Sequence, residues 1–315
     1  MSEPLVLVTG GAGFIGSHLV EALLARGHAV RVLDDLSSGK RENLAAVMDR
    51  IDFRRGDVRD EAAVRDAVAG ARFILHEAAL VSVPASVDHP DEACDIIVRG
   101  TVNVLAAARE AGVKRVVMAG SSAAYGDIPE SPKVETMAPR ALSPYAAAKV
   151  AAEMFCQAYY HSYGLETMSL RYFNVFGPRQ DPTSQYAAVI PKFLDLLHAG
   201  RRPTIYGDGG QTRDFVHVDD VVQANLAALN VPATHGEIVN IAGGNSVSIN
   251  DLLSELAGIL GVPAAADYAP PRPGDVRESL AGIGRARRLL GYEPRVTLHD
   301  GLARLAAWWG EVRKV

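Results

Sequence analysis

Residues 5–16 read LVLVTGGAGFIG, and this stretch decides the fold class. Leu5–Thr9 is an apolar run typical of a buried strand, and the apolar residues that follow Gly16 recur with a helical period. The glycines between strand and helix fit both G-x-G-x-x-G and G-x-x-G-x-x-G spacing: Gly10, Gly11, Gly13 and Gly16. A glycine turn at that place lets the backbone approach a pyrophosphate, which then lies on the helix N-terminus. The stretch therefore predicts a dinucleotide-binding α/β unit.

A second expected strand, residues 30–33, ends in Asp34. In dinucleotide-binding units an acidic residue about 20 positions after the glycine turn binds a ribose. A carboxylate accepts hydrogen bonds from both ribose hydroxyls and repels a 2′-phosphate. We therefore expect NAD, in preference to NADP, as the cofactor.

Strand and helix patterns alternate along the chain as far as Leu170. Beyond Arg171 loops rich in glycine, proline and aspartate separate shorter helices. We expect an α/β fold, with a Rossmann-type doubly wound parallel sheet and a smaller, mixed α/β substrate-binding region. The NAD-binding domain is assigned to residues 1–170 plus about 214–241, and the smaller region to 171–213 and 242–315.

Tyr145 and Lys149 are four residues apart on an expected helix that begins at Ser143-Pro144, so they share one helix face. The spacing alone also fits an ordinary surface pair. A lysine ammonium favours a phenolate, so we expect Lys149 to lower the pKa of Tyr145 and make it a general base. Ser121 follows an expected strand, at the edge of the sheet where open α/β folds bind ligands, and can hydrogen-bond the same substrate hydroxyl.

Composition narrows the class of protein. The 315-residue chain has a formal net charge of −5 and no run of basic residues, which argues against nucleic acid as a main partner. Cys94 and Cys156 are isolated, so we expect reduced thiols in the core and no metal site. The polar start at residues 2–4 does not resemble a signal peptide, and no apolar stretch approaches the roughly 20 residues that span a bilayer. A cytoplasmic protein without membrane contact is expected.

These patterns together resemble the extended short-chain dehydrogenase/reductase family, and within it the UDP-sugar 4-epimerases. The resemblance covers essentially the whole chain, in five motifs at residues 9–16, 121–126, 143–149, 171–177 and 207–220. It implies an enzyme with tightly bound NAD that inverts C4 of a UDP-hexose through a 4-keto intermediate. Tyr145 is then the base and acid, Lys149 also holds the nicotinamide ribose, and Ser121 orients the sugar hydroxyl.

The resemblance also implies which residues bind the ligands. The NAD-binding set comprises Gly10, Gly13, Phe14, Ile15, Gly16, Asp34, Asp35, Ser37, Ser38, Gly39, Asp57, Val58, Ala78, Ala79, Leu80, Tyr145, Lys149 and Tyr172. The UDP-sugar set comprises Ser82, Ser121, Ser122, Tyr145, Asn174, Ala188, Val189, Lys192, Thr204, Tyr206, Arg213, Arg272, Asp275 and Ser279. Arg213 and Arg272 would clamp the diphosphate, which suits the planar fork of a guanidinium.

Ser279 bears on the sugar that is accepted. In the family the corresponding position borders the substituent on sugar C2, where a tyrosine accompanies use of glucose and galactose alone. A serine leaves room for an acetamido group, so we expect UDP-GlcNAc and UDP-GalNAc as well as UDP-glucose and UDP-galactose. Ile97 departs from the family pattern, because many epimerases have an asparagine there that helps to position substrate or the catalytic serine loop.

Alternative activities are weighed on single residues. A nucleotide-sugar 4,6-dehydratase needs an acidic residue after the catalytic hydroxyl residue, where this chain has residues 122–124, SAA. A UDP-glucuronate 4-epimerase typically has threonine in place of Asn174 and arginine in place of Asp181. A non-catalytic NAD-binding sensor usually lacks the tyrosine or the lysine of the catalytic set.

We also expect a homodimer, joined through the helices near residues 91–111 and 143–163. The second helix carries more apolar residues than one sheet-facing stripe requires. The family resemblance implies the same pairing, as a four-helix bundle.

Overall fold

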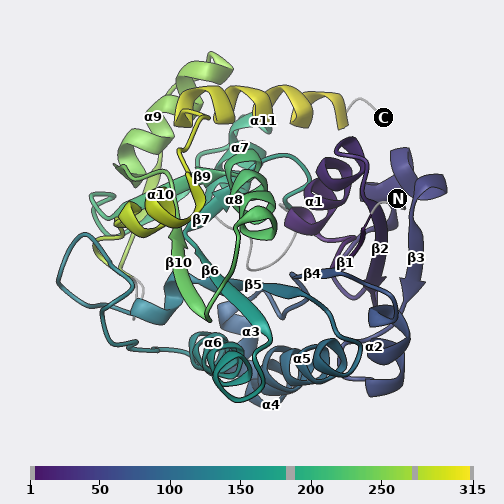
Figure 1. Ribbon diagram of the computed structural model, residues 1–315. Helices are drawn as coiled ribbons and strands as arrows, with labels where there is room; N and C mark the ends of the chain where they lie inside the picture. Colours follow the sequence, from purple (N-terminus) through teal and green to yellow (C-terminus); the bar gives the residue numbers. More distant parts are fainter. Residues whose placement is uncertain (1–3, 182–188, 272–275, 313–315) are drawn as a thin grey trace.

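The computed structural model describes residues 4–181, 189–271 and 276–312 (Figure 1). Its centre is a seven-stranded parallel sheet in the order β10-β6-β5-β4-β1-β2-β3. The strands are β1 (Leu5–Thr9), β2 (Ala29–Asp34), β3 (Asp52–Arg55), β4 (Phe73–His76), β5 (Arg115–Ser121), β6 (Glu166–Tyr172) and β10 (Glu237–Ile241). The strand order reverses between β1 and β4, so the ligand-binding crevice of a doubly wound sheet is expected at the carboxyl ends of those strands. The predicted Rossmann-type fold is confirmed.

Helices cover both faces of the sheet (Figure 1). On one face α1 (Phe14–Ala25) packs beside α8 (Val218–Asn230). On the other, α2 (Glu61–Val68), α5 (Gly100–Glu110) and α6 (Pro144–Tyr163) pack side by side. Two covered faces explain why the first four residues of β1, Leu5–Val8, are all apolar, since side chains alternate between the faces of a strand.

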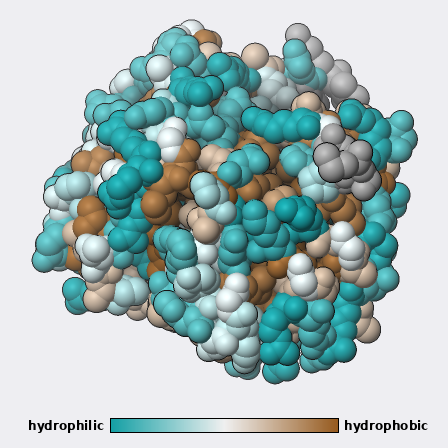
Figure 2. All heavy atoms as spheres, in the orientation of Figure 1, coloured by the Kyte–Doolittle hydropathy of each residue, from teal (hydrophilic) through white to brown (hydrophobic). Residues whose placement is uncertain are grey.

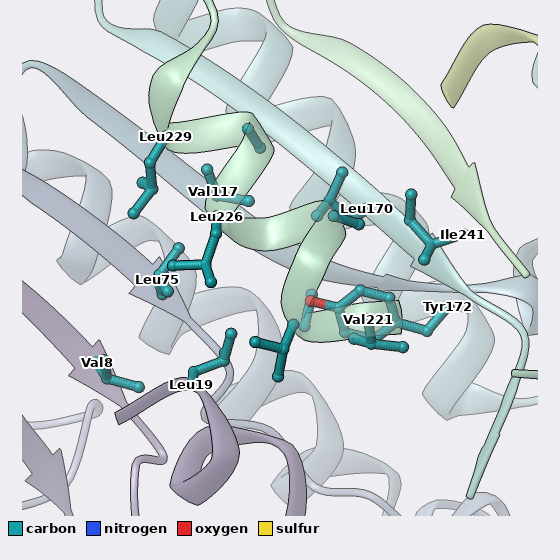
Figure 3. Close-up of a cluster of buried hydrophobic side chains, with 14 of the residues drawn as sticks. Val8, Leu19, Leu75, Val117, Leu170, Tyr172, Val221, Leu226, Leu229 and Ile241 are labelled. Atoms are coloured by element: carbon teal, nitrogen blue, oxygen red, sulfur yellow. The ribbon is translucent and has the colours of Figure 1, made fainter. Parts of the chain in front are cut away.

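The two faces have separate cores. Val6 and Val8 point into the core beneath α1 and α8, whereas Leu7 points into the core beneath α2, α5 and α6. Figure 3 shows the first of these cores, with Leu19 and Leu226 among the side chains between the strands and the helices. Residues 6–9 of the strand are therefore buried, and Leu5 is partly buried.

Helix α6 begins as its sequence predicts. The Ser143 hydroxyl accepts a hydrogen bond from the backbone N–H of Ala146 at 3.2 Å, and Pro144 occupies the first turn. The helix ends at Gly164, whose left-handed φ of 71° suits a glycine. Tyr145 and Lys149 are consequently in the first turns of a long helix.

The single helix expected over residues 91–111 is wrong in detail. The segment forms α4 (Pro90–Ala93), a π-helical turn η2 (Cys94–Arg99) and then α5. The Thr101 hydroxyl donates to the Ile97 carbonyl at 2.6 Å at this junction. The expectation of two core thiols is also wrong, because Cys94 is exposed and only Cys156 is buried.

The remaining elements form a second, smaller lobe and connections. A three-stranded sheet has the order β11-β9-β7 and a two-stranded sheet pairs β12 with β8. Helices α7, α9 and α11 enclose the core of this lobe. The further elements are η1 (Arg41–Arg50), α3 (Val83–Asp88), η3 (Ser122–Tyr125), β7 (Asn174–Phe176), α7 (Val189–His198), β8 (Thr204–Tyr206), β9 (Thr212–His217), β11 (Ser246–Ser248), α9 (Ile249–Leu260), β12 (Asp267–Ala269), α10 (Gly284–Leu290) and α11 (Leu298–Val312).

Polar side chains predominate on the face shown in Figure 2, and apolar side chains show mainly in hollows between them. Within the described ranges, no helix is both long and apolar enough to cross a membrane.

Candidate active site

A cavity of about 760 Å³ opens beyond the carboxyl ends of β5 and β6 and extends into the smaller lobe. Its size lies in the range of small-molecule sites. The predicted substrate residues that line it are Ser121, Ser122, Tyr145, Asn174, Val189, Thr204, Tyr206, Arg213 and Ser279. From the predicted cofactor set, Ile15 and Tyr172 line it as well. Residues far apart in the sequence thus meet around one cavity.

Ser121 and Tyr145 reach the cavity from two adjoining elements. Ser121 is the last residue of β5, and its hydroxyl accepts a hydrogen bond from the backbone N–H of Ala123 at 3.2 Å. The backbone N–H of Tyr145 donates to the buried hydroxyl of Ser86 in α3 at 3.0 Å. Sequence reasoning missed Ser86, since nothing in its local pattern distinguishes it from the neighbouring Ser82.

Burial raises the pKa of Tyr145, and the neighbouring Ser121 hydroxyl only partly opposes this. The expectation that Lys149 lowers the pKa of Tyr145 is therefore not met in this structure. The Lys149 ammonium lies 6.0 Å from the centre of the Tyr145 ring and donates to the Ala119 carbonyl at 2.8 Å. The lysine is therefore held at the end of β5.

The glycine turn fits a dinucleotide. A Cβ on Gly16 would stand 2.2 Å from the Gly10 carbonyl oxygen, so only glycine allows α1 to approach the turn this closely. Helix α1 has Gly13 as its N-cap, with no side-chain capping bond and no acidic residue in the first turn. Its free N–H groups and positive dipole end are suited to a pyrophosphate. The residues present therefore fit the NAD that the motif predicts.

Asp34 lies beside this turn. Its carboxylate accepts hydrogen bonds from the backbone N–H of Ala12 at 2.8 Å and of Leu36 at 2.9 Å. Burial raises its pKa, while these two N–H groups act in the opposite direction. A Cβ on Gly39 would lie 2.7 Å from the carboxylate, so the loop after β2 closes tightly around it. Each carboxylate oxygen keeps a lone pair for a ribose hydroxyl.

Other predicted cofactor residues lie in the loops that follow β2, β3 and β4. Asp35 accepts from the Ser37 hydroxyl at 2.7 Å, and Asp57 holds the Arg59 guanidinium at 2.6 Å. Ala78 follows β4, and its backbone N–H donates to the Thr9 hydroxyl at 3.3 Å. Further members lie in the same loops after β2, β3 and β4: Ser38, Val58, Ala79 and Leu80.

Two predicted substrate residues are placed elsewhere. Ser82 is the N-cap of α3, where its hydroxyl accepts from the backbone N–H of Ala85 at 3.0 Å, and it does not line the cavity. Lys192 is in α7 and is likewise not part of the lining. Ala188, Arg272 and Asp275 lie outside the described residues.

Asn174 and Arg213 support the cavity wall through backbone carbonyls. The Asn174 amide donates to the Asp214 carbonyl at 3.0 Å. The Arg213 guanidinium donates to the Thr212 carbonyl at 2.8 Å and to the Val276 carbonyl at 2.7 Å, which joins β9 to the segment that carries Ser279. Arg213 is therefore positioned at the wall by the smaller lobe.

Sequence reasoning also missed much of the lining. Val81, Val83 and Leu142 form an apolar rim and are 72%, 40% and 54% exposed. Phe193 and Phe215 contribute from the smaller lobe. Apolar residues that line a cavity follow the same helix and strand periods as core residues, so the pattern carried no separate signal for them.

Comparison with known proteins agrees with this geometry. Residues 6–242 match the NAD dependent epimerase/dehydratase family. The UDP-glucose 4-epimerase of Mycolicibacterium smegmatis is 44% identical over 303 residues, which cover 95% of this chain and 96% of that protein. Proteins named UDP-glucuronate 4-epimerase and dTDP-glucose 4,6-dehydratase match as well.

Solved structures resemble the whole chain. The crystal structure of UDP-glucose 4-epimerase from Thermotoga maritima with UDP-glucose has a TM-score of 0.93 at 37% identity, and the match covers 98% of this chain and 99% of that one. The UDP-N-acetylglucosamine 4-epimerase from Methanobrevibacter ruminantium M1, in complex with UDP-N-acetylmuramic acid, has a TM-score of 0.94 at 37% identity and covers 99% of this chain and 100% of that one.

Proposed function

The chain belongs to the NAD dependent epimerase/dehydratase family, as an extended short-chain dehydrogenase/reductase of the UDP-sugar 4-epimerase type, and we propose that it inverts C4 of a UDP-hexose. NAD is its cofactor. One observation carries the proposal. Ser121 and Tyr145, which can exchange a proton with a sugar hydroxyl, line the same cavity as Arg213, which can bind a diphosphate.

The chemistry that bound NAD supplies is reversible acceptance of a hydride from the sugar C4. Tyr145 takes the proton of the 4-hydroxyl and later returns it, while the Ser121 hydroxyl holds the sugar oxygen. Lys149 supplies a positive charge one helical turn away. Its pKa is lowered by burial, so nearby carboxylates are needed to keep it protonated.

Inversion requires the 4-keto sugar to present its other face before the proton is returned. The cavity has room for this movement, because it continues past Ser121 toward Ser279 and the apolar rim. Arg213 and Asn174 would hold the nucleotide end while the hexose turns. We place NAD on residues 1–170 with about 214–241, and the UDP-sugar on 171–213 and 242–315.

Neighbouring residues favour epimerisation over dehydration. After Ser121 the cavity is lined by Ser122 and Ala123, and neither can act as the acid that a departing 6-hydroxyl needs. Asp181 forms an ion pair with Lys40 at 2.9 Å, so the position supplies no cation for a uronate carboxylate. Asn174 lines the cavity at the place where a uronate-specific enzyme is expected to have threonine.

We further propose that the substrates include UDP-GlcNAc and UDP-GalNAc. Ser279 lines the cavity with Ser121 and Tyr145, and its side chain is small enough to leave space beside the sugar ring. A homodimer through the helical segment at residues 91–111 (α4, η2 and α5) and the helix at residues 143–163 (α6) is also proposed. On α6 the large apolar residues Met154 and Phe155 are 43% and 39% exposed, and a facing helix pair would cover them.

A panel of UDP-sugars tests the function directly. Each sugar is incubated with the purified protein, and the anomeric signals of both epimers are followed by NMR, with Tyr145→Phe as the control. Interconversion of gluco and galacto forms by the wild type alone is expected. If NAD stays bound and no UDP-sugar is converted, the non-catalytic sensor replaces the epimerase as the proposed function.

Light scattering at micromolar concentration tests the dimer, and a monomer mass would contradict it.

A further inference from the structure

Glu77 lies next to the glycine turn and does not line the substrate cavity. Glu77 directly follows β4, and its backbone N–H donates to the Thr9 carbonyl at 3.1 Å, next to the glycine turn. Its side chain accepts a hydrogen bond from the Tyr172 hydroxyl at 2.9 Å. The Tyr172 hydroxyl in turn accepts from the Asn225 amide at 2.8 Å. The loop after β4, the strand β6 and the helix α8 thus each contribute one residue to a short polar chain.

This polar chain lies at the edge of an apolar core. Tyr172 is 8% exposed and packs in the cluster shown in Figure 3, close to Val221 of α8. Such surroundings favour an uncharged group, and burial raises the pKa of Glu77, while the Tyr172 hydroxyl and the charge of Lys149 lower it. Within the described ranges, the Glu77 carboxylate forms no ion pair with a lysine, arginine or histidine. A carboxylate in this place needs a nearby positive charge. Lys149 supplies one, because its ammonium donates to the Ala119 carbonyl at 2.8 Å, and Ala119 follows Met118, the residue that pairs with His76 immediately before Glu77.

The other titratable groups around Lys149 are neutral or already paired. Glu153 binds the Arg171 guanidinium through two hydrogen bonds, of 2.9 and 2.7 Å. Burial raises the pKa of the Cys156 thiol to about 12, so it stays protonated. The ring of His76 is held between two threonine hydroxyls, and burial lowers its pKa to about 3, so it is neutral.

We propose that Glu77 is a positioning residue for proton transfer, whose carboxylate, held by Tyr172, is the counter-charge that keeps Lys149 protonated next to Tyr145. Glu77 does not line the substrate cavity, so it acts through Lys149 and not on the sugar. The inference rests on the proposed function for its effect on turnover. Its effect on Lys149 itself does not require a substrate.

The charge of Glu77 affects how Tyr145 and Lys149 share one proton. After the pair Tyr145 and Lys149 loses one proton, the remaining proton is on either the phenol or the amine. Only the form with a phenolate and an ammonium can act as the base. A nearby negative charge stabilises the ammonium, so Glu77 increases the share of this form, by about tenfold for each pKa unit that it adds to Lys149.

Glu77→Gln tests this, because an amide oxygen still accepts from Tyr172 and only the charge is lost. In this variant the plateau of the kcat profile against pH is expected to lie below that of the wild type, by about tenfold for each unit by which the pKa of Lys149 falls. Its KM is expected to stay within about twofold of the wild-type value. The acidic limb of the profile is expected at lower pH, since Glu77 no longer takes up a proton. In ¹³C-lysine-labelled holoenzyme, Lys149 is expected to titrate at lower pH, with its signal assigned by Lys149→Arg.

Tyr172→Phe is expected to shift the acidic limb of the kcat profile in the direction opposite to that of Glu77→Gln. This variant keeps the charge but removes the donor that holds down the pKa of Glu77, so its acidic limb is expected at higher pH. It also serves if Glu77→Gln does not fold. Glu166→Gln is the matched control, because Glu166 is paired with Arg115 at the opposite end of β5 and β6. It is expected to leave the titration of Lys149 unchanged.

An unchanged Lys149 titration in Glu77→Gln overturns the proposal. A lower kcat in which the acidic limb of the pH profile does not move, in either Glu77→Gln or Tyr172→Phe, also overturns it, because it would indicate a merely structural role. A shifted Lys149 titration in a protein that converts no UDP-sugar would support the charge relationship and refute the epimerase function. The two failures are therefore distinguishable.

Discussion

Glu153 and Arg171 form an ion pair beneath the active site, with both side chains almost fully buried, at 0% and 1% exposure. Glu153 is one helical turn after Lys149 on α6, and Arg171 lies opposite Gly120 in the register of β5 and β6. A Cβ on Gly120 would stand 2.9 Å from the Glu153 carboxylate. The pair therefore joins α6 to the end of the sheet that presents Ser121.

Arg171→Met is expected to lower the free energy of unfolding by about 3–5 kcal/mol, because it leaves the Glu153 charge buried without its partner. Urea unfolding followed by circular dichroism measures this. Arg287→Met is the control, since Arg287 and Glu293 form an exposed pair at 3.1 Å whose loss is expected to cost about 0–1 kcal/mol. If the two variants lose the same free energy of unfolding, burial does not set the contribution of the Glu153–Arg171 pair to stability.

Gly16→Ala is expected to weaken NAD binding by about 1–3 kcal/mol, because the new methyl group forces the turn at Gly10 away from α1. The NAD released on denaturation, counted per protomer, measures the loss. Gly258→Ala is the matched control: Gly258 is in α9, and a Cβ there would meet nothing within 4 Å. That variant is expected to keep its NAD and to gain up to about 1 kcal/mol of stability. Full NAD occupancy in Gly16→Ala would contradict the assigned cofactor site.

Tyr145→Phe is expected to reduce turnover about 10²–10⁴-fold, the usual contribution of a general acid–base group, while the fold and bound NAD are retained. Burial raises the pKa of Tyr145, so the hydroxyl is neutral in the resting protein and its removal leaves no unpaired charge. Tyr163→Phe, at an exposed position of the same helix, is expected to turn over as the wild type does. Rates are compared at several pH values, and wild-type rates for Tyr145→Phe would refute the mechanism.

Local chemistry explains which parts of the fold could be predicted from sequence. The glycine turn and the Ser143-Pro144 helix start depend on a few consecutive residues, and both are present as expected. The sequence does not predict the strands β8, β11 and β12 of the second lobe, because each has only three residues and shows no period. The π-helical turn at Cys94–Arg99 likewise has no signature in a single sequence.

Tertiary contacts explain what was missed at the site. Lys149 was expected to act on the Tyr145 phenol because the two share a helix face, yet its ammonium donates to the Ala119 carbonyl. The contact of Glu77 with Tyr172 joins residues 95 positions apart, which no local pattern can reveal. A pKa depends on burial and on such partners, so its direction follows from the fold and not from spacing.

Ser279→Tyr is expected to suppress turnover of UDP-GlcNAc far more than that of UDP-glucose. Ser279 lines the cavity with Ser121, and its segment is held by the bond from Arg213 to the Val276 carbonyl at 2.7 Å, so a larger side chain there cannot swing away freely. A phenol and an acetamido group would compete for the same space, and overpacking costs about 1–3 kcal/mol. That corresponds to roughly 5- to 150-fold in kcat/KM, measured separately for the two substrates. Ser246→Tyr, on the exposed start of β11, is the control and is expected to leave the ratio unchanged. An equal fall for both sugars in Ser279→Tyr, or a wild type that ignores N-acetylated substrates, would place the specificity determinant elsewhere in the cavity.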